Sequence, residues 1–170
     1  MVPVIAPELA TARLRLPLWS AADVEAIRGG AHLPGWHPQF PREDDRDAAT
    51  LWHDGDPWSS RSVTVDGVTV GSIGFFGPPQ PAADGAPEVE VGYGLVEDAR
   101  GRGYATEALT AMVAAAEAEG ARLRASVLPG NAASIRVLAK CGFTELRGST
   151  EDGELVMVRP RAVRPAPAPA

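Results

Sequence analysis

The chain has 170 residues, of which 45% are hydrophobic, and this size and composition fit one globular domain with a sizeable core. Its formal net charge of -6 argues against a nucleic-acid partner, because phosphate binding needs basic patches, and favours an amine-bearing partner. The single cysteine, Cys141, and the lack of a signal peptide or of about 20 consecutive apolar residues predict a cytoplasmic protein without disulfides or membrane contact.

Alternation and helical periodicity predict elements in the order βααβββαβαββ. In chain order they are a strand at 11–17, helices at 20–28 and 47–53, strands at 62–65, 68–76 and 88–96, a helix at 104–119, a strand at 121–128, a helix at 132–141, and strands at 143–150 and 154–159. Asp66 and Gly67 stand between two alternating runs, which is a strong hairpin signal. Ser20 and Asn131 are the expected helix caps.

We therefore expect a mixed α/β fold, with one twisted sheet of about seven strands covered by about four helices. We expect this fold to form a single domain at residues 1–159. The Pro/Ala-rich segment at residues 160–170 is expected to be an unstructured tail.

The run RGRGYA, at residues 100–105, stands directly before a helical pattern. Backbone N–H groups at a helix start have no partners inside the helix and attract anions. A dinucleotide-binding reading fails, because Thr106 replaces the third glycine and no acidic residue ends the following strand. A P-loop is excluded, because no Gly-Lys-Ser/Thr sequence follows.

The same run resembles the acyl-CoA-binding motif R-x-x-G-x-[GA] of the GNAT superfamily of N-acetyltransferases, with Arg100, Gly103 and Ala105 at the defining positions. The resemblance extends over most of the chain. It covers LATARLRL with the following SAADVEAI, then EVEVGYGL, GYATEAL and NAASIRVLAKCGF, in family order, and is strongest to the ribosomal-protein N-terminal acetyltransferase branch. It implies a GNAT-like fold with splayed central strands and acetyl-CoA as the cofactor.

By this resemblance, the anion is the pyrophosphate of coenzyme A, held by the backbone of Gly101, Arg102, Gly103, Tyr104 and Ala105. The physical reading agrees, because glycines permit close approach and positive φ, and the helix dipole favours negative charge. The side chains of Arg100 and Arg102 can add charge-assisted hydrogen bonds. The alternative is a glycine-softened loop with solvated arginines.

Gly92 and Gly94 interrupt the strand at residues 88–96. In the family this strand pairs with the pantetheine arm, so the resemblance implies backbone contacts from Leu95 and Val96 and an N–H near Tyr93 facing the thioester oxygen. A plain kink would need the same glycines, and the sequence leaves both open.

Acetyl transfer to an amine needs a neutral nucleophile, so a base is useful. Glu88 and Glu90 alternate onto the face that carries Gly92 and Gly94. We favour Glu90 as the catalytic base, acting directly or through water, and place Glu88 beside the substrate. The alternative for Glu90 is a surface carboxylate on a half-solvated strand.

The leaving thiolate poses a second problem, because Leu138 stands where many relatives carry a tyrosine. Ser134 lies one turn earlier on the same helical face and is the candidate catalytic group, with back-bonding inside its helix as the alternative. Asn131 caps this helix, and the resemblance adds a hydrogen bond to pantetheine.

The acceptor wall is expected in the first third of the chain, which holds all four tryptophans and an acidic cluster. We single out Trp36 and Trp58 because they fall in loops. Packing in the core is the alternative for both residues. His32 and His37 lack a third ligand, so no metal site is predicted.

Together these observations predict an acetyl-CoA-dependent N-acetyltransferase that acts on a protein N-terminus or a small-molecule amine in a ternary complex, as a monomer or homodimer. The rival hypothesis is a catalytically weak acyl-CoA sensor, because the usual tyrosine is missing. An acceptor screen separates the two.

Overall fold

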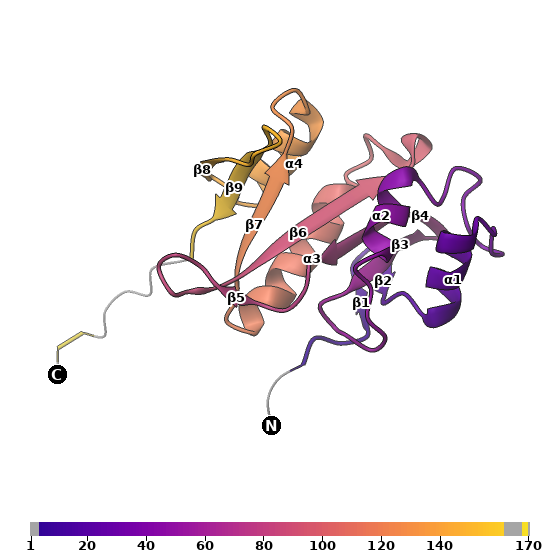
Figure 1. Cartoon of the computed structure of the whole chain (residues 1–170), viewed down its shortest axis with the longest axis horizontal. Coiled ribbons are helices and arrows are strands. Elements are labelled where there is room, and N and C mark those ends of the chain that lie inside the picture. The colour runs from indigo at the N-terminus through magenta and orange to yellow at the C-terminus, as the bar shows by residue number, and fades with distance from the viewer. Residues whose placement is uncertain (1–3, 162–167, 170) are drawn as a thin grey trace.

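The computed structural model describes residues 4–161 and 168–169, and a mixed sheet runs through it (Figure 1). Within these residues the sheet has nine strands: β1 (Glu8–Ala10), β2 (Leu14–Pro17), β3 (Ser60–Val65), β4 (Val68–Phe75), β5 (Gln80–Pro81), β6 (Pro87–Leu95), β7 (Arg122–Val127), β8 (Glu145–Ser149) and β9 (Leu155–Arg159). Their order is β1-β2-β3-β4-β6-β7-β9-β8, with the short β5 paired to β6. The mixed α/β fold is confirmed, and β1 and β5 bring the strand number above the expected seven.

The helices are α1 (Ala21–Gly29), α2 (Glu43–Ala49), α3 (Tyr104–Ala118) and α4 (Ala132–Lys140), with a short 3-10 turn, η1 (Glu97–Ala99). In Figure 1, α2 lies in front of the sheet and α3 behind it. Helix α3 packs on β2, β4, β6 and β7, and α4 packs on β7 and α3. Among the described residues, no helix combines the length and the hydropathy needed to span a membrane.

The expected turn and cap chemistry is present. Asp66 and Gly67 have φ of 49° and 78°, the pair of positive values that a two-residue hairpin turn requires. The Ser20 side chain accepts the Asp23 N–H in a capping box at α1, and the Asn131 side chain accepts the Ser134 N–H at α4. These caps fix where α1 and α4 begin.

Helix α2 corrects the prediction of a helix at residues 47–53. The carboxylate of Asp45 accepts the backbone N–H of Arg42 at 2.8 Å, and three acidic residues occupy the first turn, where the helix dipole favours negative charge. The helix therefore starts earlier in the chain. It ends at Ala49, and Trp52 beyond it donates its indole N–H to the carbonyl of Trp19 at 3.1 Å.

Strands β6 and β7 pair in parallel only at the start of β6, in a register that ends with Glu90 opposite Arg124. Beyond this point β6 continues along β4 alone. The two strands therefore part in their second halves, which is the splayed arrangement expected for the centre of the sheet.

The ladder between β4 and β6 determines which backbone groups face the gap. Val96 donates its N–H to Val70 at 2.8 Å, and Phe76 donates to Glu90 at 3.0 Å. Hydrogen-bonded pairs alternate along an antiparallel ladder, so the backbone groups of Tyr93 and Leu95 point away from β4. They face the space where β7 has separated.

The proposed tail at residues 160–170 falls largely outside the described residues. The division into one domain at residues 1–159 and a tail stays a prediction.

Candidate active site

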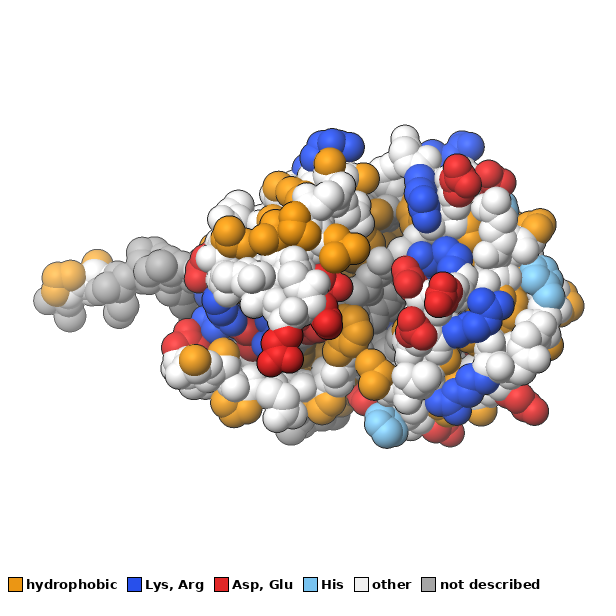
Figure 2. All heavy atoms as spheres, turned by 45° about the horizontal axis from the view of Figure 1, so that its top comes forward, with side chains coloured by type: hydrophobic (Ala, Val, Ile, Leu, Met, Phe, Trp, Pro, Cys, Tyr) orange, Lys and Arg blue, Asp and Glu red, His pale blue; other side chains and the backbone are white. Residues whose placement is uncertain are grey.

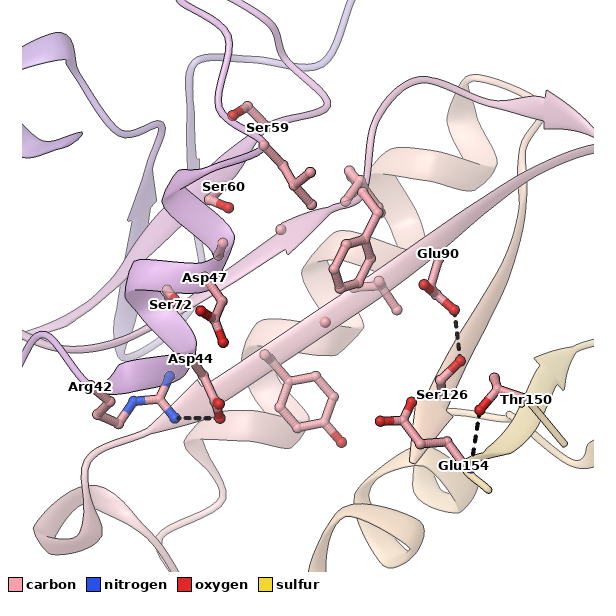
Figure 3. Close-up of a pocket in the computed structure, with 18 of the residues that line it drawn as sticks. Arg42, Asp44, Asp47, Ser59, Ser60, Ser72, Glu90, Ser126, Thr150 and Glu154 are labelled. Carbon is pink, nitrogen blue, oxygen red and sulfur yellow. Dashed lines mark hydrogen bonds and ion pairs between the residues drawn. The ribbon is translucent and has the colours of Figure 1, made fainter. Parts of the chain in front are cut away.

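Two cavities meet at β6. The first has a volume of about 590 Å³ and lies between α2, the middle of β6 and the turn between β8 and β9 (Figure 3). The second has a volume of about 460 Å³ and is bounded by the end of β6, the start of α3 and α4. Arg42, Asp44 and Tyr93 line both, so the two cavities are adjacent at these residues.

The second cavity gathers most of the predicted cofactor residues. Those that line it are Tyr93, Leu95, Arg100, Gly101, Gly103, Tyr104, Ala105 and Asn131, together with the catalytic candidate Ser134. Val96 and Arg102 do not line it. Val96 is 1% exposed and its N–H is held by Val70, which explains why it offers little to a ligand.

The glycine run forms the start of α3. Gly101 and Gly103 have φ of 76° and 82°, and Gly103 is the residue before the first helical turn. An α-helix leaves the N–H groups of its first turn without partners inside the helix, which here are those of Tyr104, Ala105 and Thr106. These donors, with the positive end of the α3 dipole, suit a phosphate group.

The start of the chain holds this loop in place. Arg13 donates to the carbonyl of Arg102 at 2.9 Å and pairs with Glu107 at 3.0 Å, and its guanidinium lies 4.7 Å from the centre of the Tyr104 ring. Thr11 donates to the same Glu107 carboxylate at 2.6 Å. The anion-binding turn is therefore fixed by contacts from a segment about ninety residues away in the chain.

Two cations of this cavity were missed by the sequence reasoning. Arg136 and Lys140 stand four residues apart on α4, and both line the cavity. The available signal was this spacing, which puts both side chains on one helical face after the Asn131 cap. With Arg100, they give the cavity a positive wall that matches the phosphates of coenzyme A.

Glu90 and Ser126 form the best-defined polar pair of the first cavity, and both line it. The Ser126 hydroxyl on β7 donates to Oε1 of Glu90 at 2.7 Å, as Figure 3 shows. The Glu90 side chain is 25% exposed, so it remains open to the cavity. Ser126 was also missed by sequence reasoning, because nothing in the sequence gives its register against β6.

Glu88 shares the face of Glu90 but lies outside both cavities, and its side chain is 1% exposed. Arg122, Arg124 and Arg147 all donate to it, at 2.6 to 3.0 Å. Burial alone raises the pKa of this carboxyl, but the hydrogen bonds from Arg147, Arg124 and Arg122 outweigh burial and lower the pKa to about 2. Glu88 therefore links three strands and is not brought to the site.

Trp36 and Trp58 do not line either cavity. Trp36 is 9% exposed and packs edge-on against Phe40. The ring centre of Trp58 lies 5.1 Å from that of Phe75. The loop of Trp36 folds back onto the sheet, as the hydrogen bond from the His37 N–H to the carbonyl of Thr69 shows. Both side chains therefore pack against the core, which was the alternative to a place in the acceptor wall.

At the start of α4, the Tyr93 hydroxyl lies 3.4 Å from the carbonyl oxygen of Ser134, and burial raises the pKa of this phenol. Leu138, which stands where many relatives carry a tyrosine, is 1% exposed and belongs to the core. The phenol nearest the junction of the cavities thus comes from β6 and not from α4.

Carboxylates dominate the first cavity. Its acidic lining residues are Asp44, Asp47, Glu90, Asp152 and Glu154, and Arg42 is the only lysine or arginine among the described residues that line it. In Figure 3, Asp44 and Asp47 lie on the α2 side while Glu90 and Glu154 lie opposite, and Figure 2 shows acidic side chains on both sides of a hollow. Such a lining favours a cationic or amine-bearing guest.

The comparisons with known proteins agree with this arrangement. Residues 13–144 match the family model described as the acetyltransferase (GNAT) domain. A search of curated proteins found no significant match.

Similar folds occur among solved structures. An acetyltransferase from Agrobacterium tumefaciens is 24% identical with a TM-score of 0.63, over 92% of this chain and 95% of that one. A ribosomal-protein-S5-alanine acetyltransferase from Vibrio fischeri is 17% identical with a TM-score of 0.59, over 90% and 94%. RimJ from Mycobacterium smegmatis, solved with CoA-disulfide, is 22% identical with a TM-score of 0.56, over 92% and 87%. The family match extends over most of the chain, and the chain belongs to the GNAT acetyltransferase family, whose enzymes use acetyl-CoA.

Proposed function

We propose that this protein transfers the acetyl group of acetyl-CoA to a primary amine by direct attack, with both substrates bound at once. The observation that carries the proposal is the meeting of a cation-lined cavity and a carboxylate-lined cavity at Arg42, Asp44 and Tyr93. One cavity suits the donor and the other suits an amine. Direct transfer needs no covalent enzyme intermediate when both cavities are filled together.

The chain's residues fit acetyl-CoA, which supplies the acetyl group as a thioester. The pyrophosphate would be held by the N–H groups of residues 101–105 and by Arg100. Tyr93 and Leu95 offer backbone groups that face the gap beside β6, where they would pair with the pantetheine arm. The N–H of Tyr93 would donate to the thioester carbonyl oxygen, and Asn131 would donate to the pantetheine arm.

Glu90 is the proposed base. Oε1 is held by Ser126, and Oε2 has no hydrogen-bond partner among the described residues, so it can receive a proton from the amine through water. The neutral amine nitrogen would then bond to the acetyl carbon as the carbon–sulfur bond breaks, and the second proton that the nitrogen gives up would pass to the departing thiolate. Ser134, or the nearby phenol of Tyr93, supplies a hydrogen bond to the departing sulfur.

The loss of a tyrosine at Leu138 does not require a different reaction. A thiol with a pKa near about 8.5 leaves tolerably without an acid, and general acid catalysis contributes about 10² to 10⁴ in rate. The chain is thus expected to turn over, at a rate below that of an enzyme with the acid.

The test is acceptor-dependent release of free thiol from acetyl-CoA with a panel of N-terminal peptides and small amines. Release that rises with acceptor concentration and saturates supports the proposal. Binding of acetyl-CoA with no release above the acceptor-free rate, for every amine in the panel, identifies a sensor instead.

A further inference from the structure

Arg42 occupies the junction of the two cavities in a fixed orientation. Its Nε and Nη2 donate to Asp45 at 3.0 and 2.7 Å, and Asp45 is fully buried. The Ser72 hydroxyl on β4 donates to the same carboxylate at 2.5 Å. The Arg42 side chain is only 17% exposed, so its position is set by a buried pair and not by solvent.

Gly94 leaves room for this guanidinium. A Cβ at Gly94 would overlap Nη1 of Arg42 and would lie 2.6 Å from Nη2 and 2.7 Å from Cζ. The glycine therefore lets the guanidinium rest directly on β6, one residue beyond Tyr93. This gives Gly94 a role that the sequence could not separate from a simple kink.

The guanidinium also has hydrogen-bond capacity left. An arginine carries five N–H donors, and Asp45 takes one from Nε and one from Nη2. Among the described residues Nη1 makes no hydrogen bond, and its one ion-pair contact is to Oδ2 of the exposed Asp44 at 3.8 Å. The N–H groups of Arg42 that Asp45 does not accept are thus available to a ligand oxygen.

Along β6, Glu90 and Arg42 bracket the reaction position from opposite sides. Gly94 follows Glu90 by four positions along the strand, which is about 13 Å. The ring of Phe76 covers Gly92, so an amine placed beside Tyr93 has the carboxylate on one side and the guanidinium on the other. An acceptor can contact both the Glu90 carboxylate and the Arg42 guanidinium only if it carries an oxygen a few bonds from its amine.

We propose that Arg42 determines acceptor specificity by hydrogen bonding a carbonyl or carboxylate oxygen next to the reacting amine, so that α-amino amides and α-amino acids are preferred over plain alkylamines. This inference rests on the proposed acetyl transfer at the same site. It concerns recognition of the acceptor and assigns Arg42 no step in the chemistry.

The experiment compares L-alanine, L-alaninamide and isopropylamine, in acetyl transfer and in binding to the protein saturated with coenzyme A. Each acceptor is compared with itself between wild type and Arg42→Gln, so differences in amine pKa cancel. We expect kcat/KM and affinity to fall about 10- to 100-fold for alanine or alaninamide, the size of a lost charge-assisted hydrogen bond, and less than about 3-fold for isopropylamine. The larger fall among the first two tells whether a carboxylate or a carbonyl is read.

Two further variants keep the test decisive. Arg42→Gln leaves Asp45 buried without its partner, so Gly94→Ala is measured as well, because its Cβ forces the guanidinium to shift while both charged residues stay in the chain. Arg46→Gln is the matched control, because Arg46 is exposed on the same helix and lines neither cavity.

Equal losses for all three compounds, or no preference of the wild type for alanine or alaninamide over isopropylamine, overturn the proposal. If alaninamide binding depends on Arg42 but no amine is acetylated, the proposed function fails and the specificity inference stands.

Discussion

The hydroxyl of Ser126 donates a hydrogen bond of 2.7 Å to Oε1 of Glu90 across the point where β7 separates from β6. The last paired residues of the two strands are Glu90 and Arg124, so the bond lies at the opening of the gap. It orients one carboxylate oxygen and leaves the other facing the first cavity. The base proposed from the sequence is thus held in place by a residue that the sequence did not indicate.

Replacing Glu90 by glutamine is expected to lower kcat by about 10²-fold or more, within the range of general base catalysis. The loss is largest below neutral pH, where an α-amine with a pKa near about 7.7 is mostly protonated and needs the base most. Steady-state kinetics from pH 6 to 9 measure this. Ser126→Ala keeps the carboxylate and is expected to cost less than Glu90→Gln. A pH profile of Glu90→Gln parallel to that of wild type would remove Glu90 as the base.

Gly103→Ala is expected to raise KM for acetyl-CoA about 10-fold. Its φ of 82° disfavours a Cβ, and the added atom would lie 3.2 Å from Nη2 of Arg13, which holds the loop. Gly148→Ala is the matched control, because Gly148 also has φ of 82° but is exposed in β8, away from both cavities. Both variants should lose similar stability in thermal melts. Equal KM values for the two would contradict a binding role for the loop.

The double variant Arg136→Gln/Lys140→Gln is expected to weaken acetyl-CoA binding and to flatten its salt dependence, because two cations leave the second cavity. Isothermal titration at about 50 and 200 mM salt measures both effects. The loss should be smaller for acetyl-dephospho-CoA, which carries fewer phosphates. If the double variant binds both ligands as wild type does, these cations do not contact the cofactor.

Glu88 is expected to make stability depend on pH below about 4.5. Its folded pKa of about 2 lies below the ordinary glutamate pKa of 4.5, so its contribution is present above pH 4.5 and is lost as the pH falls towards 2. The shift corresponds to a contribution on the order of 3 kcal/mol. Urea unfolding from pH 7 to pH 2.5 should show this loss for wild type and for Glu25→Gln, whose exposed carboxylate makes no ion pair among the described residues. Glu88→Gln should be less stable at pH 7 and should lack that part of the pH dependence. Parallel curves of unfolding free energy against pH for wild type and Glu88→Gln would refute this contribution of Glu88.

Ser134→Ala is expected to lower kcat by less than about 10²-fold, because the thiolate leaves tolerably without an acid. Tyr93→Phe removes the other hydroxyl near the junction, and Ile135→Val on α4 serves as the structural control. If Ser134→Ala and Tyr93→Phe together leave kcat unchanged, neither hydroxyl assists the leaving group.

The sequence predicted features that depend on local chemistry. The Asp66-Gly67 hairpin, the caps at Ser20 and Asn131, and α3 with its glycine run follow from turn geometry and from helix termini, which neighbouring residues decide. Helix α2 was misplaced, because its start depends on Asp45, whose carboxylate is held by Ser72 from a distant strand. The anion-binding role of residues 101–105 stays a prediction, and it rests on the same helix start.

The acceptor side could not be predicted, because it depends on tertiary packing. Trp36 and Trp58 fall in loops, yet both fold onto the sheet, and Glu88 turns inward because three arginines from other strands surround it. Arg42 gave no signal, because its proposed role comes from the position of its guanidinium over Gly94, which only the folded chain shows. Residues that meet only in the folded chain, such as Ser126 and Glu90, need the strand register before they can be recognised.

The most direct test of acetyl transfer traces the acetyl group from acetyl-CoA to its acceptor. Acetyl-CoA labelled in the acetyl carbon is incubated with the protein and an amine acceptor, and the label is located by mass spectrometry of the acceptor and of the intact protein. Direct acetyl transfer predicts label in an amide of the acceptor, in proportion to the thiol released, and none bound covalently to the protein. Label that stays in acetyl-CoA with every acceptor, or that accumulates on the protein, would contradict direct acetyl transfer.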